Sequence, residues 1–133
     1  MTIAIKPIIG SNGNDQLNGG NGHELLSGRG GNDLIITGNG HDVAHGGAGN
    51  DEIHGNSGND TLYGGADDDI LVGGTNDDSI YGGTGNDKIV VGDNHGTDVI
   101  EGGEDASGLN NDILDLNDLS TTGGTNVTLT GNE

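Results

Sequence analysis

The feature that most constrains this chain is a nine-residue repeat, which runs without a gap from Gly10 to Val90. Self-similarity at a short fixed period is typical of solenoids, in which each repeat stacks on its neighbours. The nine copies in register indicate such an architecture. They read GSNGNDQLN, GGNGHELLS, GRGGNDLII, TGNGHDVAH, GGAGNDEIH, GNSGNDTLY, GGADDDILV, GGTNDDSIY and GGTGNDKIV.

Two positions of the repeat, counted from Gly10, keep their chemical type throughout. The sixth is always acidic and the eighth always aliphatic, while the fifth is always Asn, Asp or His. The fourth is glycine except at Asp67 and Asn76. The acids are Asp15, Glu24, Asp33, Asp42, Asp51, Asp60, Asp69, Asp78 and Asp87, and the aliphatics are Leu17, Leu26, Ile35, Ala44, Ile53, Leu62, Leu71, Ile80 and Ile89.

These preferences predict the fold of one repeat. Gly, and after it Asn and Asp, adopts the positive φ angles of tight turns, so the first six residues are expected to form a turn. The last three form a strand about 10 Å long, with the central aliphatic side chain facing inward. So short a strand must pair with the strand of another repeat. Two repeats therefore make one coil of 18 residues, and the coils stack.

The sequence thus predicts an all-β fold, a solenoid built of two short-stranded parallel sheets. The eighth-position side chains form the core between the sheets. Leu17, Ile35, Ile53, Leu71 and Ile89 come from one sheet, and Leu26, Ala44, Leu62 and Ile80 from the other. Ala44 leaves the core thin at one point.

The acidic residues create an electrostatic problem in such a stack. The chain has 22 acids against three bases, a net charge of −19 and 28% hydrophobic residues, which is the composition of a disordered chain. Stacking places the acids in two rows, with coils about 4.8 Å apart, where like charges repel. We call Asp15, Asp33, Asp51, Asp69 and Asp87 the first row, and Glu24, Asp42, Asp60 and Asp78 the second row. A cation between adjacent acids would relieve the repulsion.

Oxygen-only sites of this kind suit a hard cation. Calcium accepts six to eight oxygens in flexible geometry, whereas magnesium demands a stricter octahedron. The two rows offer seven adjacent pairs, and seven divalent ions would leave a net charge of about −5. The sequence therefore predicts about seven or eight bound Ca²⁺ ions.

The segment from Gly10 to Val90, about three fifths of the chain, resembles the RTX (repeats-in-toxin) calcium-binding β-roll family. The resemblance implies a right-handed parallel β-roll (a β-solenoid), calcium between successive turns, disorder without calcium, and export by a type I secretion system. It also implies that turn carbonyls complete each calcium shell. By that match the backbone ligands are Gly13, Gly20, Gly22, Gly31, Gly38, Gly40, Gly47, Gly49 and Gly58.

Several residues depart from the repeat pattern. Glu24 is one methylene longer than Asp, so we expect weaker binding or a shifted turn there. Asp67 and Asn76 are expected to strain their turns, and Arg29 to compete locally with an ion. Thr37 replaces a first-position glycine.

The register breaks after Val90. We expect Asp98 to follow Asp78 and to make an eighth site, while Asp112 either follows Asp87 or binds nothing. The predicted organisation is an N-terminal cap or lead-in at 1–9, the roll at 10–90, degenerate repeats and a C-terminal cap at 91–119, and a tail at 120–133. The cap includes a closing strand at 113–119, and 126–130 is either a final strand or frayed.

Composition also bounds the function. The negative charge disfavours nucleic acid and anionic membranes as partners, and no stretch is apolar enough to span a bilayer. There is no cysteine. The first seven residues lack the apolar core of a secretory signal peptide, so we expect a chain that is cytosolic, exported by another route or a fragment of something larger. An extracellular location follows only from the resemblance. No catalytic motif stands out, so we predict no enzyme. The five histidines are expected to have surface or turn roles. A transition-metal site would need two histidines stacked on neighbouring coils, and only His23 and His41 have the 18-residue spacing for this.

The outer faces of the roll leave alternatives open. Leu34, Ile36, Ile70, Val72 and Val90 lie on the outer side of one predicted sheet. Either they are covered by the tail or scattered singly, or they form a patch for self-association or for a neighbouring domain. An accessory module that contacts carbohydrate or acts as an adhesin is a further alternative. Ice binding is disfavoured because Thr61, Thr75 and Thr84 do not repeat at 18-residue spacing.

Overall fold

A computed structural model describes residues 5, 7–91, 96–103, 111–116 and 126–129. Within these residues the regular secondary structure consists of strands only. No helix occurs there, and therefore none that could cross a membrane. The strands are β1 (Pro7–Ile9), β2 (Gln16–Gly20), β3 (Leu25–Gly30), β4 (Leu34–Asn39), β5 (Val43–Ala48), β6 (Glu52–Ser57), β7 (Thr61–Ala66), β8 (Ile70–Thr75), β9 (Ser79–Thr84), β10 (Lys88–Val90), β11 (Thr97–Glu101), β12 (Ile113–Asp115) and β13 (Asn126–Leu129).

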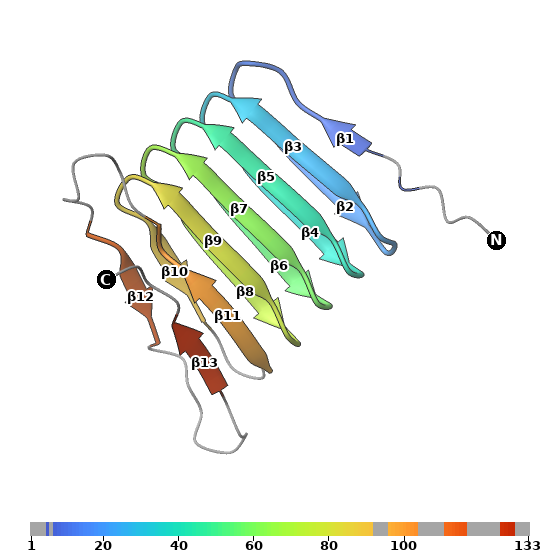
Figure 1. Cartoon of the computed structure of the whole chain (residues 1–133). Helices are drawn as coiled ribbons and strands as arrows, with labels where there is room; N and C mark the ends of the chain where they lie inside the picture. Colours follow the sequence, from blue (N-terminus) through green and yellow to red (C-terminus); the bar gives the residue numbers. More distant parts are fainter. Residues whose placement is uncertain (1–4, 6, 92–95, 104–110, 117–125, 130–133) are drawn as a thin grey trace.

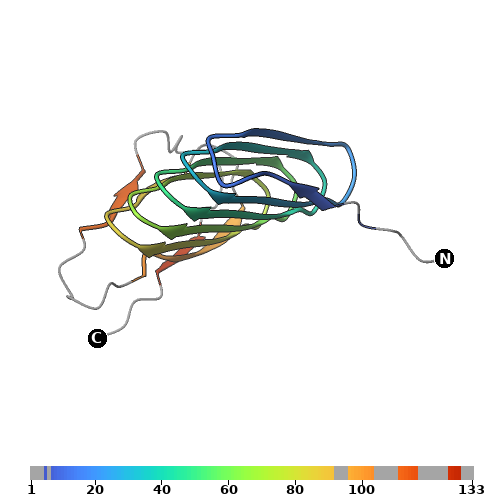
Figure 2. The same ribbon diagram turned by 90° about the horizontal axis from the view of Figure 1, so that it is seen from above.

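The strands form two parallel sheets that face each other (Figure 1). The seven-stranded sheet has the order β1-β3-β5-β7-β9-β11-β13, and the six-stranded sheet has the order β12-β10-β8-β6-β4-β2. Within the repeats each strand pairs with the strand 18 residues on, as in Leu17↔Ile35 and Ile35↔Ile53. Successive coils therefore stack on one another as a flattened solenoid (Figure 2). The predicted β-solenoid is confirmed.

The strands are longer than the sequence predicted. Strands β3 to β9 have six residues each, so each repeat contributes six strand residues and three turn residues instead of the reverse. The reason is that positions two and three still pair with the next coil, as in Gly38↔Asn56 and Asn39↔Ser57. Position two takes a positive φ in most coils, for example 126° at Gly47, so the strand bends without losing its partner.

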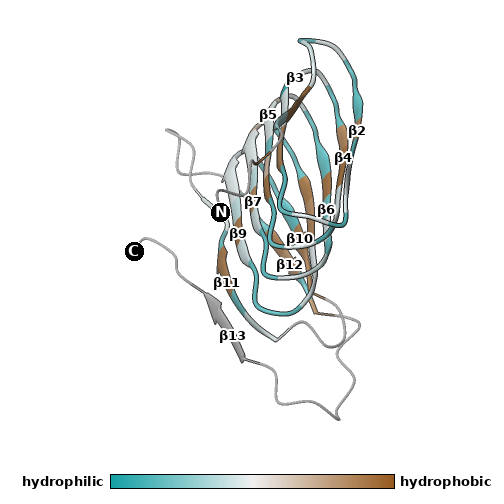
Figure 3. Ribbon diagram, turned by 90° about the vertical axis from the view of Figure 1, so that its right-hand side faces the viewer, coloured by the Kyte–Doolittle hydropathy of each residue, from teal (hydrophilic) through white to brown (hydrophobic). Residues whose placement is uncertain are grey.

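The predicted core is confirmed residue for residue. All nine eighth-position side chains are buried, and Val91 and Ile100 join them. Leu17, in the terminal coil, is the most exposed of them at 8%. Figure 3 shows the hydrophobic segments on the strands, whereas the turns, and parts of some strands, are hydrophilic. One aliphatic side chain per nine residues is therefore enough to give each coil a dry interior.

The two ends of the roll continue the same pairing. Strand β1 pairs with β3, so Ile8 lies beside Leu26 as a lead-in to the stack. At the other end β11 pairs with β9 and β13, and β12 pairs with β10. The predicted closing strand is therefore Ile113–Asp115 within the described residues, and 117–119 and Thr130 lie outside them. The predicted domain boundaries stay predictions.

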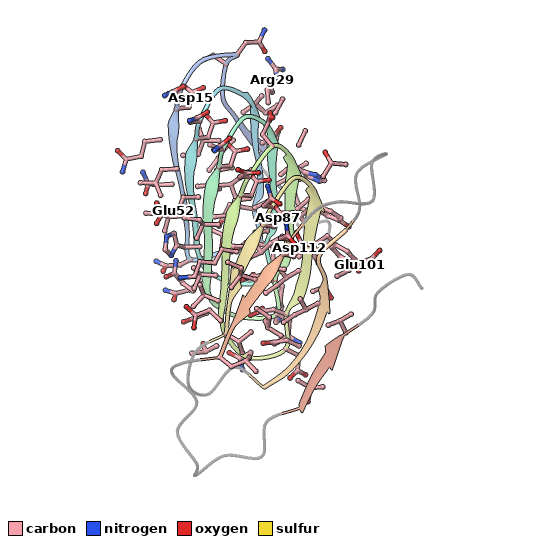
Figure 4. All side chains as sticks on the ribbon, turned by 90° about the vertical axis from the view of Figure 1, so that its left-hand side faces the viewer. Asp15, Arg29, Glu52, Asp87, Glu101 and Asp112 are labelled. Atoms are coloured by element: carbon pink, nitrogen blue, oxygen red, sulfur yellow. The ribbon has the colours of Figure 1, made fainter. Side chains whose placement is uncertain are left out.

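The outer face of the six-stranded sheet is not one apolar patch. Glu52 and His54 of β6 lie between the apolar residues of β4 and those of β8, and Glu52 Oε1 and His54 Nε2 are 2.7 Å apart. Figure 4 shows Glu52 on the outer side of this sheet. Of the five predicted patch residues, only Ile70 reaches 41% exposure. A polar pair thus divides the group.

Candidate metal centres

Each row of acids is held in register by hydrogen bonds between coils. The backbone N–H of one sixth-position residue donates to Oδ1 of the aspartate one coil later. The donor–acceptor distance is 2.7 Å from Asp15 to Asp33, 2.8 Å from Asp33 to Asp51 and 2.7 Å from Asp51 to Asp69. The second row repeats the bond from Glu24 to Asp42 and from Asp42 to Asp60. One carboxylate oxygen of every inner aspartate therefore already has a partner.

Both rows extend beyond the regular repeats. The N–H of Asp78 donates to Oδ1 of Asp98 at 2.9 Å, across 20 residues. The N–H of Asp87 donates to Oδ1 of Asp112 at 3.0 Å, across 25 residues, and Figure 4 places these two side chains next to each other. The predicted placement of Asp98 after Asp78 is confirmed, and of the two alternatives for Asp112 the structure supports the one in which it follows Asp87.

The second oxygen of the inner aspartates has no partner. These aspartates are 1–3% exposed. Their Oδ2 atoms are buried without a hydrogen bond in seven cases, namely Asp33, Asp42, Asp51, Asp60, Asp69, Asp78 and Asp87. Leaving a buried polar atom unpaired is costly, more so for a charged group. A buried polar atom without a partner in a native fold commonly marks the place of an ion or a water molecule.

Burial makes the charged form of these carboxylates unfavourable. It raises the pKa of Asp42, and it raises the pKa of Asp51, Asp60 and Asp87 to about 6, of Asp69 to about 7 and of Asp78 to about 8. The backbone hydrogen bonds lower each pKa and the neighbouring carboxylates raise it further. For Asp78 these neighbours are Asp98, Asp60 and Asp77. A cation beside Oδ2 would reverse this preference.

Asp15 differs because it lies in the terminal coil. Its Oδ2 accepts the Ser11 N–H at 2.6 Å and the Ser11 hydroxyl at 2.8 Å. These bonds lower the pKa of Asp15. Ser11 thus satisfies the oxygen that is left unpaired in the inner coils.

First-position glycines leave room around the unpaired oxygens. A Cβ on Gly46 would overlap Oδ2 of Asp51, and it would lie 2.6 Å from the carbonyl oxygen of Gly64 one coil later. The same pair of oxygens, an aspartate Oδ2 and a carbonyl, crowds Gly28, Gly55, Gly64 and Gly82. Only a residue without a side chain keeps this space open.

Carbonyl oxygens at positions two and four point toward the following coil. A Cβ on Gly38 would overlap the Gly20 oxygen, and a Cβ on Gly40 would overlap the Gly22 oxygen. The same relation holds for the carbonyls of Gly31, Gly40 and Gly47 toward Gly49, Gly58 and Gly65. The role of these five as calcium ligands stays a prediction, as it does for Gly13, Gly38, Gly49 and Gly58.

Most of any cation shell would have to come from the backbone. Across the described part of the chain, no group of three or more His, Cys, Asp or Glu side chains comes together as a metal site. The unpaired Oδ2 atoms and the carbonyl oxygens near the first-position glycines are all oxygen donors. This donor set fits a hard divalent cation.

The residues that depart from the repeat pattern behave differently from one another. Asp67 and Asn76 have φ angles of 78° and 83°, in the left-handed region that Asp and Asn tolerate, so the predicted strain is largely absorbed. Glu24 keeps the bond to Asp42, and its Oε2 accepts the Gly20 N–H at 3.2 Å. Arg29 is exposed with φ 83°, and its predicted competition with an ion stays a prediction.

The fifth position has a structural role that sequence reasoning missed. Its side-chain acceptor takes the backbone N–H of the fifth-position residue one coil later. Asn32 donates to Asn14 at 2.9 Å, and Asn86 donates to Asp68 at 2.8 Å. His41 donates to His23 Nδ1 at 3.0 Å, and their rings stack with centroids 5.1 Å apart. Asn, Asp and His share an acceptor at the same distance from Cα, which explains why only these three occur there.

Comparison with known protein families decides the identity of these coils. A model of the RTX calcium-binding nonapeptide repeat matches four times, at residues 8–35, 36–71, 63–97 and 72–109. The chain belongs to the RTX calcium-binding nonapeptide repeat family. Repeats of this family bind calcium. That the rows of aspartates supply its ligands stays a prediction. No curated protein matches the chain.

Proposed function

We propose that this RTX chain is a structural module of a secreted protein, and that it folds when calcium binds between its coils. The observation that carries the proposal is the set of seven buried aspartate Oδ2 atoms without a hydrogen-bond partner. In a chain with a net charge of −19, these oxygens destabilise the roll unless a cation neutralises them.

The proposed ligands of each ion come from both of the adjacent coils between which it binds. The side-chain ligands are Asp15, Glu24, Asp33, Asp42, Asp51, Asp60, Asp69, Asp78, Asp87 and Asp98, and the chain is proposed to bind about seven or eight ions. Carbonyl oxygens of the first four turn positions complete the shells. Support comes from the shared register of the carboxylates and from the carbonyls that point along the stack.

Calcium would supply positive charge and several oxygen bonds at once. Because only the folded chain brings the oxygens together, binding free energy becomes folding free energy. Low cytosolic calcium would leave the chain extended and competent for type I export, and millimolar calcium outside would fold it. Affinities of about 10⁻⁴–10⁻³ M, the range of extracellular modules, suit that switch.

Circular dichroism with a calcium titration tests the proposal. The spectrum of the chelated chain is expected to be that of a coil and to become that of β-structure as calcium is added. An excess of EDTA should reverse the change, and magnesium at equal concentration should produce much less of it because of its stricter geometry. A β-spectrum that is already present under chelation, and that calcium leaves unchanged, would refute the proposal.

A further inference from the structure

Thr37 is the one first-position residue among the nine repeats that is not glycine. It is fully buried, at 0% exposure. At Gly28, Gly46, Gly55, Gly64 and Gly82, a Cβ would overlap an aspartate Oδ2 and a carbonyl oxygen of the next coil. The side chain of Thr37 therefore occupies a place that glycine leaves to these two oxygens in those coils.

The hydroxyl of Thr37 already serves the carbonyl at this place. Thr37 Oγ1 donates to the Gly55 carbonyl oxygen at 2.6 Å. The equivalent carbonyls of Gly46, Gly64 and Gly82 instead face a glycine one coil earlier. A hydroxyl has a single proton to donate, and with that proton on the Gly55 carbonyl the Oδ2 of Asp42 has no hydrogen bond. The neighbouring Thr37 hydroxyl still lowers the pKa of Asp42, against the larger rise that burial causes.

We propose that Thr37 closes the calcium position beside Asp42 and replaces the ion there with a direct hydrogen bond between coils. The proposal rests on the calcium binding proposed above. The Thr37 side chain fills the space beside Asp42, and its hydroxyl donates to the Gly55 carbonyl, one of the two oxygens there. The contact between these two coils in the second row therefore depends on calcium less than the other contacts do. The second row then binds one ion fewer than its number of carboxylate pairs suggests.

Counting bound calcium in Thr37→Gly tests this assignment. Equilibrium dialysis with radioactive calcium, or native mass spectrometry, would give the number of ions on the full-length chain. Thr37→Gly restores the open space and is expected to bind one more ion than the wild-type chain. Thr37→Val keeps the space filled but lacks the hydroxyl, so its count should equal that of the wild type while its unfolding temperature falls.

Two further variants serve as controls. Thr75→Gly removes a threonine whose hydroxyl also donates to a carbonyl, that of Asn56 at 3.3 Å, but outside the first position. Its ion count should not change. Gly46→Thr introduces the same side chain at the equivalent position of the first row, and its folded fraction should bind one ion fewer.

The outcomes separate this inference from the proposed function. An unchanged count in Thr37→Gly would overturn the closure by Thr37, and a lower count would make Thr37 a ligand instead. In either case the wild-type chain still binds calcium. If the wild-type chain binds no calcium, the proposed function itself fails.

Discussion

At the scale of the residue, each inner aspartate has two separate roles. Its Oδ1 fixes the register by accepting an N–H from the previous coil, and its Oδ2 lies unpaired in the interior. The sequence predicted the rows of acids and the need for a cation, because acids 18 residues apart stack when two nine-residue repeats make one coil. It could not predict the unequal use of the two oxygens, which depends on the direction of each N–H. The sequence also gave no reason to expect that the side chain of Thr37 fills a calcium position.

Replacing an inner acid should cost more than replacing a terminal one. Asp51→Ala removes the acceptor of the Asp33 N–H, which alone costs about 1–3 kcal/mol, and removes a proposed ligand of two ions. Asp15→Ala removes only exposed bonds with Ser11 and a proposed ligand of one ion. Thermal unfolding in excess calcium should therefore show a much larger loss for Asp51→Ala. Equal losses would contradict shared sites between stacked coils.

First-position glycines should tolerate alanine poorly. In Gly46→Ala the new methyl group would overlap Oδ2 of Asp51, and we expect a loss of about 1–3 kcal/mol from overpacking. Gly20→Ala is the matched control, because a Cβ there meets nothing within 4 Å, and its change should stay within about 1 kcal/mol. Chemical denaturation of both variants in calcium measures the difference. Similar stabilities would show that the space beside Gly46 is not needed.

At the scale of the element, the repeat predicts the sheets and the core but not the length of the strands. The alternation around Leu62 identifies an inward side chain, and every eighth-position residue is buried as predicted. Glycines at positions one and two were assigned to the turn, since glycine usually ends a strand. The backbone of the position-two residue nevertheless pairs with the next coil, as in Gly47↔Gly65. Stacking of identical coils thus overrides local propensity.

Two isoleucines in neighbouring strands of one sheet should differ sharply. Ile53 is fully buried at 0% exposure, whereas Ile70 is 41% exposed on the outer face. We expect Ile53→Ala to cost about 2–5 kcal/mol in calcium and Ile70→Ala less than about 1 kcal/mol. Urea denaturation at fixed calcium would measure both. A large effect of Ile70→Ala would instead indicate that its face is covered.

At the scale of the whole molecule, folding is a balance between a small core and a large negative charge. A single aliphatic side chain per repeat stabilises the coil, and the net charge of −19 opposes its compaction. The sequence predicted this conflict from composition alone. The closure of the roll by Asp98 and Asp112 was harder to predict, because insertions move these residues 20 and 25 positions from their partners.

The benefit of calcium should shrink as the pH falls. Burial raises the pKa of Asp78 to about 8 and of Asp69 to about 7 from the ordinary value of 3.8. Without calcium, the stability that neutral carboxylates give the fold is therefore present at acidic pH and is lost as the pH rises through 7 to 8. Calcium needs the charged form, so protons compete with it. We expect the difference in folded fraction between calcium-loaded and chelated protein, read by circular dichroism, to be smaller at pH 5 than at pH 8. A difference that is independent of pH would contradict this linkage.

Small-angle X-ray scattering of the chain in calcium and after complete chelation tests the central claim most directly, with magnesium at equal ionic strength as the control. If cations between the coils hold the roll together, the radius of gyration should be close to that of a compact chain of 133 residues in calcium, about 14 Å, and should approach that of an unfolded chain, about 38 Å, after chelation. Magnesium should leave the chain expanded. A compact chain after complete removal of calcium would contradict the account.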